Sequence, residues 1–323
     1  MATVVLIAYH GDAWLPACLK TLADASADPL HLVLVDNAGN TILDEVDLSA
    51  FEAEVLSTPR PMGFAEANNF ALVEASRLRE TVLFLNQDTM SPPGWVDACL
   101  QGLATHSHFG AVSPLIRTYE DDGWDPSFLD CLSEAQEAAL QREEGGQRIL
   151  TTQTAPAPAL LVRTAVLQDT GPFDPVYGSY YEDYDLCRRI RAQGRAVGFC
   201  RNARVRHFSG GSTTTEAQER RRMRQVIRNR VLYELRKGDA PRWWAVLKRV
   251  LGDFPWRLAR GVAGTPSSQP PSVTLKAYAD LANIAGRLVS KQRDRQMWEQ
   301  YLMELRWKKR MTEHTAKRPS RYA

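Results

Sequence analysis

The residues best suited to chemistry stand where a turn-rich loop meets an expected helix, at Glu182 and Asp183. The loop, residues 171–181, holds two prolines, two glycines and three tyrosines, a composition typical of an ordered turn segment. After it, apolar residues recur at helical spacing from Leu186 to Ile190. Because the free N–H groups of a first helical turn favour a negative charge, we expect Asp183 to be ionised and able to accept a proton.

The alternative is that Asp183 only caps the helix, a common role for an acid at a helix N-terminus. Glu182 is interpreted as a residue that orients the loop or the acceptor of a reaction. Asp185 lies within one turn of Arg188 and Arg189, and we expect it to pair with them. Both acidic neighbours are therefore predicted to support Asp183 and not to react themselves.

A second polar group follows an apolar run at residues 81–85, and it contains Asn86 and Asp88. Hard cations such as Mg²⁺ and Mn²⁺ bind proteins through one or two carboxylates and complete their shell with substrate phosphates. The position of Asp88 directly after an expected strand therefore predicts a divalent-cation ligand. Tyr9 and Asp36 stand at the ends of two other apolar runs.

Gly63 opens a further expected helix that continues to about Arg77. The first N–H groups of such a helix can bind a phosphate. A glycine before a helix is more often only part of a turn. The sequence leaves both interpretations of Gly63 in place.

Short apolar runs alternate with amphipathic helices along the first part of the chain, which predicts an α/β fold. Strand, helix and strand within about 35 residues form a βαβ unit, and ligands bind outside the carboxyl ends of its parallel strands. We therefore expect a Rossmann-like, mostly parallel sheet with flanking helices, with Tyr9 and Asp36 at the ligand-binding edge. The expected strands are residues 3–10, 31–37, 54–57, 81–85, 110–116, 154–162, 196–200 and 204–208.

An acidic, irregular stretch interrupts this alternation at residues 119–146. It is typical of an excursion over the surface. Most of its carboxylates are expected to be solvated and to have no role, as charged runs usually are.

The charge of the chain is unevenly distributed behind a net charge of only +2 for 323 residues. Residues 1–200 hold 12 Lys and Arg against 28 Asp and Glu, a net of −16, whereas residues 201–323 hold 28 against 10, a net of +18. The two parts are therefore expected to face different partners, or each other.

The five cysteines are scattered and show no CxxC spacing, and no apolar run approaches the roughly 18 residues of a membrane span. The N-terminal apolar run lacks the basic flank of a signal peptide. A cytoplasmic protein with reduced thiols is expected, with association to the cytoplasmic face of a membrane as an extension of this location.

The basic C-terminal part is expected to be helical. A first helix at 219–237 buries an apolar face, and a second at 241–258 sets tryptophan and leucine opposite lysine and arginine, as helices at membrane surfaces do. The alternatives are that this apolar face covers the first domain or forms a homodimer. A linker at 265–272 precedes a long helix at 273–311 and a polar tail. No nucleic-acid readout module is recognisable, so nucleic acid is not an expected partner.

Six short blocks occur in a fixed order along residues 1–215. Together they resemble the family 2 glycosyltransferases of the GT-A fold, specifically the rhamnosyltransferase-like branch. One block alone would be a weak signal, whereas the ordered set is specific. The blocks are Ala8–His10, Val35–Asn37, Met62–Ala65 with Asn68 and Asn69, Leu85–Asp88, Gly171–Asp174 with Tyr181–Leu186, and Val205–His207 with Gly210–Ser212.

The resemblance implies a site for a nucleoside-diphosphate sugar at the strand ends. By this match Tyr9 stacks on the nucleobase, and Asp36 accepts a hydrogen bond from the base N3–H. Gly63 and Asn68 belong to the donor-binding blocks. Asn86 occupies the first acidic slot of the family's DXD motif, an exchange common in this branch.

The same match assigns the reacting groups. Asp88 corresponds to the metal-binding acid of the DXD motif, which implies Mg²⁺ or Mn²⁺ as cofactor. His207 corresponds to the histidine that helps to hold the metal and the diphosphate, and Asp183 to the general base. Beside these groups, Glu182 is expected to orient the loop or the acceptor, and Tyr181 to stack on a sugar or to pack the loop.

The chain departs from the family pattern at three places. His10 stands where the family often has asparagine, and Gln87 where this branch often has proline. Ala157 and Pro158 replace the usual Gly-Ala pair before an apolar strand. Because glycine there would let the backbone approach the sugar closely, the departure leaves the identity of the donor sugar undetermined.

The expected function is therefore that of an inverting, metal-dependent glycosyltransferase. It would move a sugar from a dTDP-rhamnose-like or UDP-sugar donor to a hydroxyl of a glycan or lipid-linked acceptor. The alternatives are a non-catalytic scaffold that binds nucleotide sugars or glycans with the same fold, and a membrane or nucleic-acid adaptor built on the basic part. The predicted organisation is a catalytic GT-A domain at 1–215, basic amphipathic helices at 216–264, the linker at 265–272, and a helix with its tail at 273–323.

Overall fold

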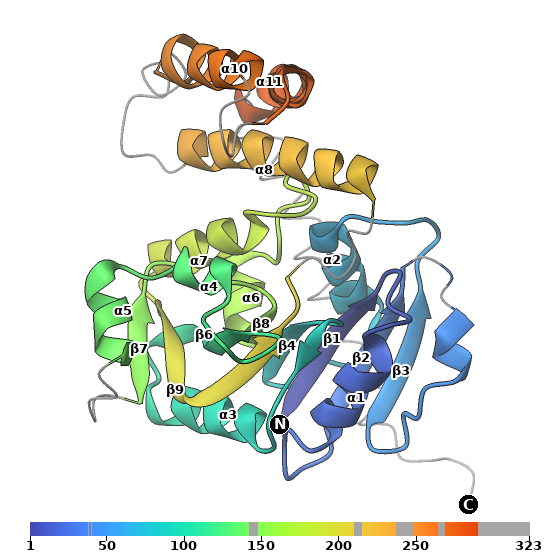
Figure 1. The fold of residues 1–323 in the computed structure, drawn as a ribbon. Coiled ribbons are helices and arrows are strands. Elements are labelled where there is room, and N and C mark those ends of the chain that lie inside the picture. The colour runs from blue at the N-terminus through green and yellow to red at the C-terminus, as the bar shows by residue number, and fades with distance from the viewer. Residues whose placement is uncertain are drawn as a thin grey trace, which may run out of the picture.

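The computed structural model describes residues 1–37, 39, 41–141, 148–209, 215–236, 248–263 and 269–289. A twisted sheet with helices on both faces forms the body of the molecule, and further helices lie beyond it (Figure 1). The strands are β1 (Ala2–Ala8), β2 (His31–Asp36), β3 (Glu52–Ser57), β4 (Thr81–Asn86), β5 (Thr89–Met90), β6 (Phe109–Thr118), β7 (Ile149–Thr152), β8 (Ala159–Arg163) and β9 (Ala196–His207).

The helices of the body alternate with these strands, as the sequence predicted. They are α1 (Leu15–Ala23), the 3₁₀ turn η1 (Thr41–Asp44), α2 (Phe64–Glu74), α3 (Trp95–Thr105), α4 (Pro126–Leu129), α5 (Glu134–Gln141), α6 (Thr164–Thr170) and α7 (Glu182–Ala192). The remaining described helices are α8 (Glu216–Arg236), the π-helical turn η2 (Arg249–Asp253), α10 (Phe254–Val262) and α11 (Pro271–Val289).

The sheet has a parallel half and a mixed half. The strand order is β3-β2-β1-β4-β8-β6-β9-β5, with β7 paired to β9 outside this path. Strands β3, β2, β1 and β4 run parallel, and β8 is antiparallel to both β4 and β6. The predicted α/β class with flanking helices is confirmed, and the reversal at β8 brings the start of that strand to the carboxyl end of β4.

Two apolar layers hold the sheet between its helices. On one face, α1 and α3 cover side chains such as Leu34 and Leu83, and on the other, α2, α6 and α7 cover Val33 and Phe84. Because alternate residues of one strand point to opposite faces, a strand buried on both faces must be apolar throughout. This packing explains the unbroken apolar runs in the sequence.

Strand β9 differs from the expectation of two short strands. The stretches predicted at 196–200 and 204–208 form one strand, Ala196–His207. Its pairing with β6 shifts register between Pro114 and Leu115, where the partner changes from Cys200 to Arg204. The irregular residues are therefore absorbed by a bulge and do not end the strand.

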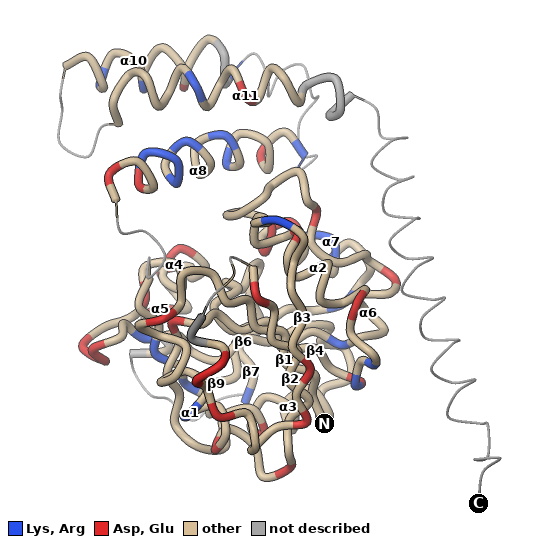
Figure 2. The backbone as a smooth tube through the Cα atoms, turned by 90° about the vertical axis from the view of Figure 1, so that its right-hand side faces the viewer, with Lys and Arg blue, Asp and Glu red and all other residues tan. Residues whose placement is uncertain are grey.

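The C-terminal helices form a separate layer. Helix α8 lies between the body and the pair α10–α11, and an ion pair from Arg224 to Asp280 joins α8 to α11 (Figure 1). Figure 2 shows the basic residues gathered along α8. Helix α11 begins at Pro271, inside the predicted linker, and the expected helix beyond residue 289 and the residues 241–247 lie outside the described part of the chain.

None of the described helices is both long and apolar enough to cross a membrane. All five cysteines are buried and present as free thiols. The fold therefore contains no disulfide between them, in agreement with their scattered spacing.

Candidate active site

The carboxyl ends of β1, β2 and β4 meet at one edge of the sheet. In the register of these strands Ala8 pairs with Asp36, and Ile7 pairs with Asn86. The first residue after β1, Tyr9, therefore lies next to both ends. The structure brings together Tyr9, Asp36 and Asn86, which the sequence placed at separate strand ends.

The side chain of Gln87 ties this edge together, and its role was not predicted. Its amide oxygen accepts the backbone N–H of Tyr9 at 2.9 Å, and its amide nitrogen donates to the carbonyl of Tyr9 at 2.7 Å. A side chain at Gly11 would collide with the Gln87 amide, since a Cβ there would lie 2.1 Å from its oxygen. The sequence signal was the presence of glutamine where the family pattern has proline, a residue whose side chain cannot make these bonds.

The imidazole of His207 lies beside Asp88. Strand β5 pairs with the end of β9, which sets Thr89 opposite His207. As a result Nε2 of His207 is 3.4 Å from Oδ1 of Asp88 and 3.4 Å from the amide nitrogen of Asn86. Two predicted ligands from residues 119 positions apart thus face each other.

A second acid, Asp125, contacts His207 at its other ring nitrogen, Nδ1. The Asp125 carboxylate is fully buried, and its Oδ2 accepts the Nδ1–H of His207 at 3.0 Å. Asp125 is therefore an exception to the expectation that most carboxylates of the stretch 119–146 are solvated and without a role, whereas Glu120, Asp121 and Asp122 are exposed as expected. The stretch 142–147 lies outside the described residues.

The two carboxylates control the charge of the histidine. Burial alone would lower the pKa of His207, but the hydrogen bonds and charges of Asp125 and Asp88 outweigh it and raise the pKa to about 9. Burial would likewise raise the pKa of Asp125, whereas the bonds that this carboxylate accepts from His207, Ser127 and Ser209 hold it at about 2. The group is therefore a buried ion pair at neutral pH.

This cluster fits part of a divalent-cation site. No group of three or more His, Cys, Asp or Glu side chains arranged for a metal ion occurs among the described residues. Mg²⁺ and Mn²⁺ do not need such a cage, since they bind through one or two protein ligands and substrate phosphates. Asp88 and His207 could supply those two donors, and the donor diphosphate would have to supply the rest.

Helix α7 carries Asp183 in its first turn, as predicted. The Asp183 carboxylate is half-buried and accepts the backbone N–H of Tyr184 at 2.8 Å and that of Ala157 at 3.1 Å. Burial raises its pKa to about 6, and these two bonds act in the opposite direction. Burial therefore opposes the expected effect of the helix terminus, although the carboxylate still ionises below neutral pH.

Glu182 is a buried acid whose Oε2 has no hydrogen-bond partner. Burial, followed by the charge of Asp183, raises its pKa well above the ordinary value. Glu182 is therefore held as a neutral acid beside the ionised Asp183.

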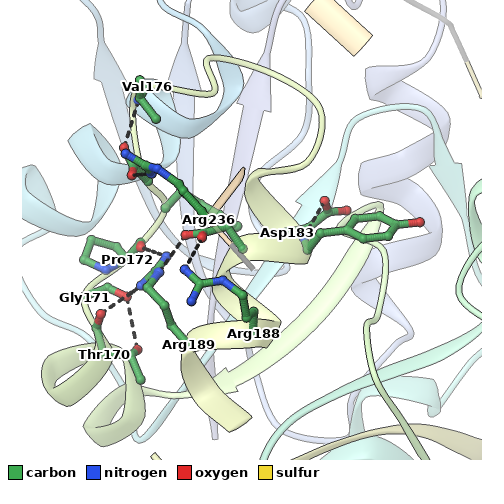
Figure 3. Close-up of polar contacts among 12 residues, drawn as sticks. Thr170, Gly171, Pro172, Val176, Asp183, Arg188, Arg189 and Arg236 are labelled. Carbon is green, nitrogen blue, oxygen red and sulfur yellow. Dashed lines mark hydrogen bonds and ion pairs between the residues drawn. The ribbon is translucent and has the colours of Figure 1, made fainter. Parts of the chain in front are cut away.

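Asp185 pairs with Arg188 and Arg189, as expected, at 2.6 and 2.7 Å. Burial acts against its charge, but the two guanidinium groups outweigh it and lower its pKa. Arg189 also donates to the backbone carbonyls of Thr170, Gly171 and Pro172 (Figure 3). In the same view Asp183 points away from this arginine cluster. Asp185 therefore fixes the loop, and Asp183 faces a different side of α7.

The loop before α7 has a strained backbone that helix α8 supports. Tyr180 and Tyr181 adopt positive φ values of 71° and 70°, which non-glycine residues rarely do. The buried amide of Asn229 on α8 donates to the carbonyls of Tyr177, Ser179 and Tyr180 at 2.8, 2.7 and 2.7 Å. These bonds cross the predicted boundary at 215/216, and no pattern in the sequence predicted them.

One short segment, residues 157–158, contacts both the predicted base and the strand end that carries the predicted cation ligand Asp88. Ala157 donates its N–H to Asp183, and the next residue, Pro158, accepts the backbone N–H of Asn86 at 2.9 Å. Asn86 in turn lies beside His207. The segment that departs from the family pattern thus connects both halves of the candidate site.

Gly63 and Asn68 take part in packing. The N–H groups of Phe64 and Ala65 donate to Ser179 and Gly178, so the first amides of α2 bind the loop at residues 171–181. A Cβ at Gly63 would lie 3.1 Å from the backbone of Gly178. This use of the amides gives Gly63 a role in the close approach of two backbone segments, as expected of a glycine that is part of a turn.

The amide of Asn68 is buried and donates to the carbonyl of Phe64 within α2. Its neighbour Asn69 binds the backbone of Phe173 through both amide atoms, at 2.7 and 3.1 Å. Donor contacts of Gly63 and Asn68 stay predictions.

Tyr181 stacks against Tyr184 and Tyr233, with ring centroids 5.0 and 5.9 Å apart.

Comparisons with known proteins agree with this arrangement. A family model described as "Glycosyltransferase like family 2" matches residues 2–227. The N-acetylglucosaminyl-diphospho-decaprenol L-rhamnosyltransferase of Mycobacterium tuberculosis is 25% identical over 244 residues, which cover 65% of this chain and 76% of that protein.

Solved structures share the fold at low identity. A structure of S. aureus TarS 1–349 in complex with UDP-GlcNAc has a TM-score of 0.55 and 17% identity, over 86% of this chain and 80% of that one. The mannosyltransferase PcManGT from Pyrobaculum calidifontis, in complex with GDP-Man and Mn²⁺, has a TM-score of 0.52 and 19% identity, over 95% and 86%. GalNAc-T7 with UDP, GalNAc and Mn²⁺ has a TM-score of 0.52 and 16% identity, over 75% of this chain and about half (52%) of that one.

Proposed function

Since the chain belongs to the family 2 glycosyltransferases, whose model matches residues 2–227, we propose that it is an inverting, metal-dependent enzyme of that family. It transfers a sugar from a nucleoside-diphosphate donor to a hydroxyl of a glycan or lipid-linked acceptor. The observation that carries this proposal is the segment at 157–158, which binds Asp183 on one side and the Asn86–Asp88 strand end on the other.

Stabilisation of the leaving diphosphate and deprotonation of the acceptor fall to side chains at opposite ends of the site. Asp88 and His207 would hold a Mg²⁺ or Mn²⁺ ion, which when bound neutralises the leaving diphosphate as a Lewis acid. Asp183 accepts the proton of the acceptor hydroxyl as that oxygen attacks the anomeric carbon. One base and one displacement invert the configuration, by the geometry that separates inverting from retaining glycosidases.

The donor is expected to lie along the strand ends. Tyr9, which Gln87 fixes through both of its backbone groups, stacks on the nucleobase, and Asp36 accepts from the base. The mycobacterial relative is named for L-rhamnose and for a decaprenol-linked N-acetylglucosaminyl diphosphate. This name favours a dTDP-rhamnose-like donor over a UDP-sugar, and a lipid-linked acceptor over a free glycan.

A lipid-linked acceptor would bring the protein to a membrane surface on the cytoplasmic side. Three apolar residues of the outer helices η2 and α10 are largely exposed, namely Leu251 (68%), Trp256 (56%) and Val262 (75%). Their exposure supports docking of these helices on lipid. A homodimer through the same residues is the alternative partner.

The test of the base is the variant Asp183→Asn. Because a positioned general base contributes about 10²–10⁴-fold, kcat for sugar transfer should fall by that factor while the Kd of the donor is retained. Asp169→Asn makes the same chemical change at an exposed residue of α6 and should transfer at the wild-type rate. An unchanged kcat in Asp183→Asn would remove Asp183 as the base, and absence of transfer by the wild-type protein would favour the non-catalytic scaffold.

The donor is identified by thermal shift of the wild-type protein. A ligand that binds only the folded state raises the melting temperature, by an amount that grows with its concentration over Kd. We expect a dTDP- or UDP-sugar to raise Tm, and to raise it more with Mn²⁺ than without. A shift that is the same with and without Mn²⁺ would argue against metal dependence.

A further inference from the structure

The buried carboxylate of Asp125 receives hydrogen-bond donors at both oxygens. Oδ1 accepts from the backbone N–H groups of Ser127 at 2.8 Å and Phe128 at 3.4 Å, which caps helix α4. Oδ2 accepts from the hydroxyl of Ser209 at 2.5 Å and lies 3.0 Å from Nδ1 of His207. Since an ionised carboxylate only accepts hydrogen bonds, Nδ1 of His207 carries the proton of this contact.

The other ring nitrogen of His207 faces the cation side. Nε2 lies 3.4 Å from both Asp88 Oδ1 and the Asn86 amide nitrogen. A histidine binds a metal through one unprotonated nitrogen, and the hydrogen bond at the second nitrogen decides which one that is. With a proton fixed on Nδ1, only Nε2 can act as a ligand, and a cation binds there by displacing the proton that Nε2 carries in the ion pair.

We propose that Asp125 is a positioning residue, which keeps the proton of His207 on Nδ1 and thereby presents the Nε2 lone pair to a divalent cation bound at Asp88. This inference rests on the proposed function, since it concerns the cation that Asp88 and His207 would hold. Asp125 touches neither donor nor acceptor in this account and acts only through the imidazole.

The variant Asp125→Asn tests this role because the hydrogen bonds of the helix cap fix the orientation of the new amide group. The N–H groups of Ser127 and Phe128 need an acceptor, so the amide oxygen takes the place of Oδ1 and the amide nitrogen that of Oδ2. The amide nitrogen then donates to Nδ1 of His207. The proton is forced to Nε2, and the lone pair for the cation is lost, although shape and helix cap are retained.

Mn²⁺ affinity of the full-length protein is the main readout, measured without nucleotide by the electron paramagnetic resonance signal of free Mn²⁺. Asp125→Asn should bind Mn²⁺ about 10- to 100-fold more weakly, the usual effect of removing a carboxylate behind a metal-bound histidine. Asp122→Asn is the matched control, because it changes an exposed acid of the same segment that has no contact with His207, and it should bind as the wild type does.

A double-mutant cycle separates this role from a general loss of charge or structure. His207→Ala should weaken Mn²⁺ binding, and Asp125→Asn should have no further effect in that background. Wild-type affinity in Asp125→Asn, or an equal loss with and without His207, would overturn the inference while leaving the cation site in place. Wild-type affinity in His207→Ala would overturn both the inference and the proposed cation site. Melting temperatures of all variants are recorded alongside.

A second measurement does not depend on the fold of a variant. In ¹⁵N spectra of the wild-type protein, with His207→Ala to assign the signals, addition of Mg²⁺ with UDP or dTDP should deprotonate Nε2 and leave the Nδ1–H in place. Loss of the proton from Nδ1, or no change at either nitrogen at saturating Mg²⁺, would overturn the proposal.

Discussion

Asp183 is subject to two opposite influences, and their balance sets the pH at which a base at this position works. Burial raises the pKa of its carboxyl to about 6, while the N–H groups of Tyr184 and Ala157 favour the charged form. Glu182 beside it is kept neutral by its own burial and by the charge of Asp183. The result is one ionised carboxylate between a neutral acid and two amide donors.

This balance predicts the pH dependence of transfer. The working form of a base is ionised, so activity is present above the folded pKa and is lost as the pH falls through it. With donor and cation saturating, kcat should be level above about pH 7 and fall tenfold per unit below about pH 6. Because Asp183 and Glu182 interact, the falling limb of this pH profile reports the titration of the two carboxyl groups together. The residual rate of Asp183→Asn should lack this limb, and a level wild-type kcat from pH 5 to 8 would contradict the assignment.

Residue types at strand ends could be predicted from the sequence, whereas their partners could not. Asp88, His207 and Asp183 follow short apolar runs or open a helix, so local pattern and the family blocks located them. Asp125 stands in an acidic segment whose carboxylates were mostly expected to be solvated, and only the fold shows that this one is fully buried. Gln87 was likewise noted only as a departure, since its contacts with Tyr9 join residues 78 positions apart.

At the scale of elements, helix α8 is part of the support of the candidate site. Its residues Asn229, Arg228 and Arg236 bind the loop at residues 171–181 through backbone carbonyls and Asp174. The loop ends in Tyr180 and Tyr181, whose positive φ values persist only if the surroundings hold them. The loop that leads into the proposed base on α7 is therefore supported by a helix that the sequence assigned to a different domain.

Asn229→Ala tests this support. The variant removes the buried donor of the Ser179 and Tyr180 carbonyls, while Arg228 still donates to Tyr177, and the expected cost is about 1–3 kcal/mol in the free energy of unfolding. We expect a lower melting temperature together with a lower kcat, because the loop that leads into Asp183 loosens. Arg221→Ala, at an exposed position of α8, should change neither quantity. Loss of stability with an unchanged kcat would show that α8 supports the fold and not the site.

The elements themselves were largely predictable, because a strand buried on both faces needs an unbroken apolar run. This rule located β1, β2 and β4 within a few residues. It gave no information on the direction of β8 or on the bulge that makes β9 one strand, since both depend on which strands lie side by side. The boundary at 215/216 was placed by composition, which does not register contacts between distant segments.

At the scale of the whole molecule, the exposed apolar residues of the C-terminal part lie in the outermost helical layer. Helices α10 and α11 form this layer, and the basic helix α8 lies between it and the body (Figure 2). Between residues 251 and 263 every exposed residue is apolar. These residues are Leu251, Gly252, Pro255, Trp256, Ala259, Val262 and Ala263. The guanidinium of Arg260 lies 4.7 Å from the ring centroid of Trp256, an arrangement that suits the boundary between lipid headgroups and acyl chains.

The last prediction is that the full-length protein binds vesicles of anionic phospholipid through this face. Binding should weaken with salt, since exposed charges are screened, and with replacement of anionic by neutral lipid. The variant Leu251→Glu/Val262→Glu should bind at least about 10-fold more weakly, because burial of each apolar side chain contributes roughly 1.5–3 kcal/mol. Val55→Glu is the matched control, since Val55 is 52% exposed on the edge strand β3, far from this layer along the chain.

The same variants separate a lipid surface from a second copy of the chain. If the apolar face formed a homodimer, Leu251→Glu/Val262→Glu would shift sedimentation velocity toward the monomer at any salt and leave vesicle binding as it was. If it docks on lipid, the chain stays monomeric in both forms, and only its partition to vesicles changes. Transfer to a water-soluble acceptor should be equal in both proteins, because the described contacts of Asp183, Asp88 and His207 come from parts of the chain other than η2 and α10. A drop in that rate would show that the outer helices act on the site itself and not on the approach to a membrane.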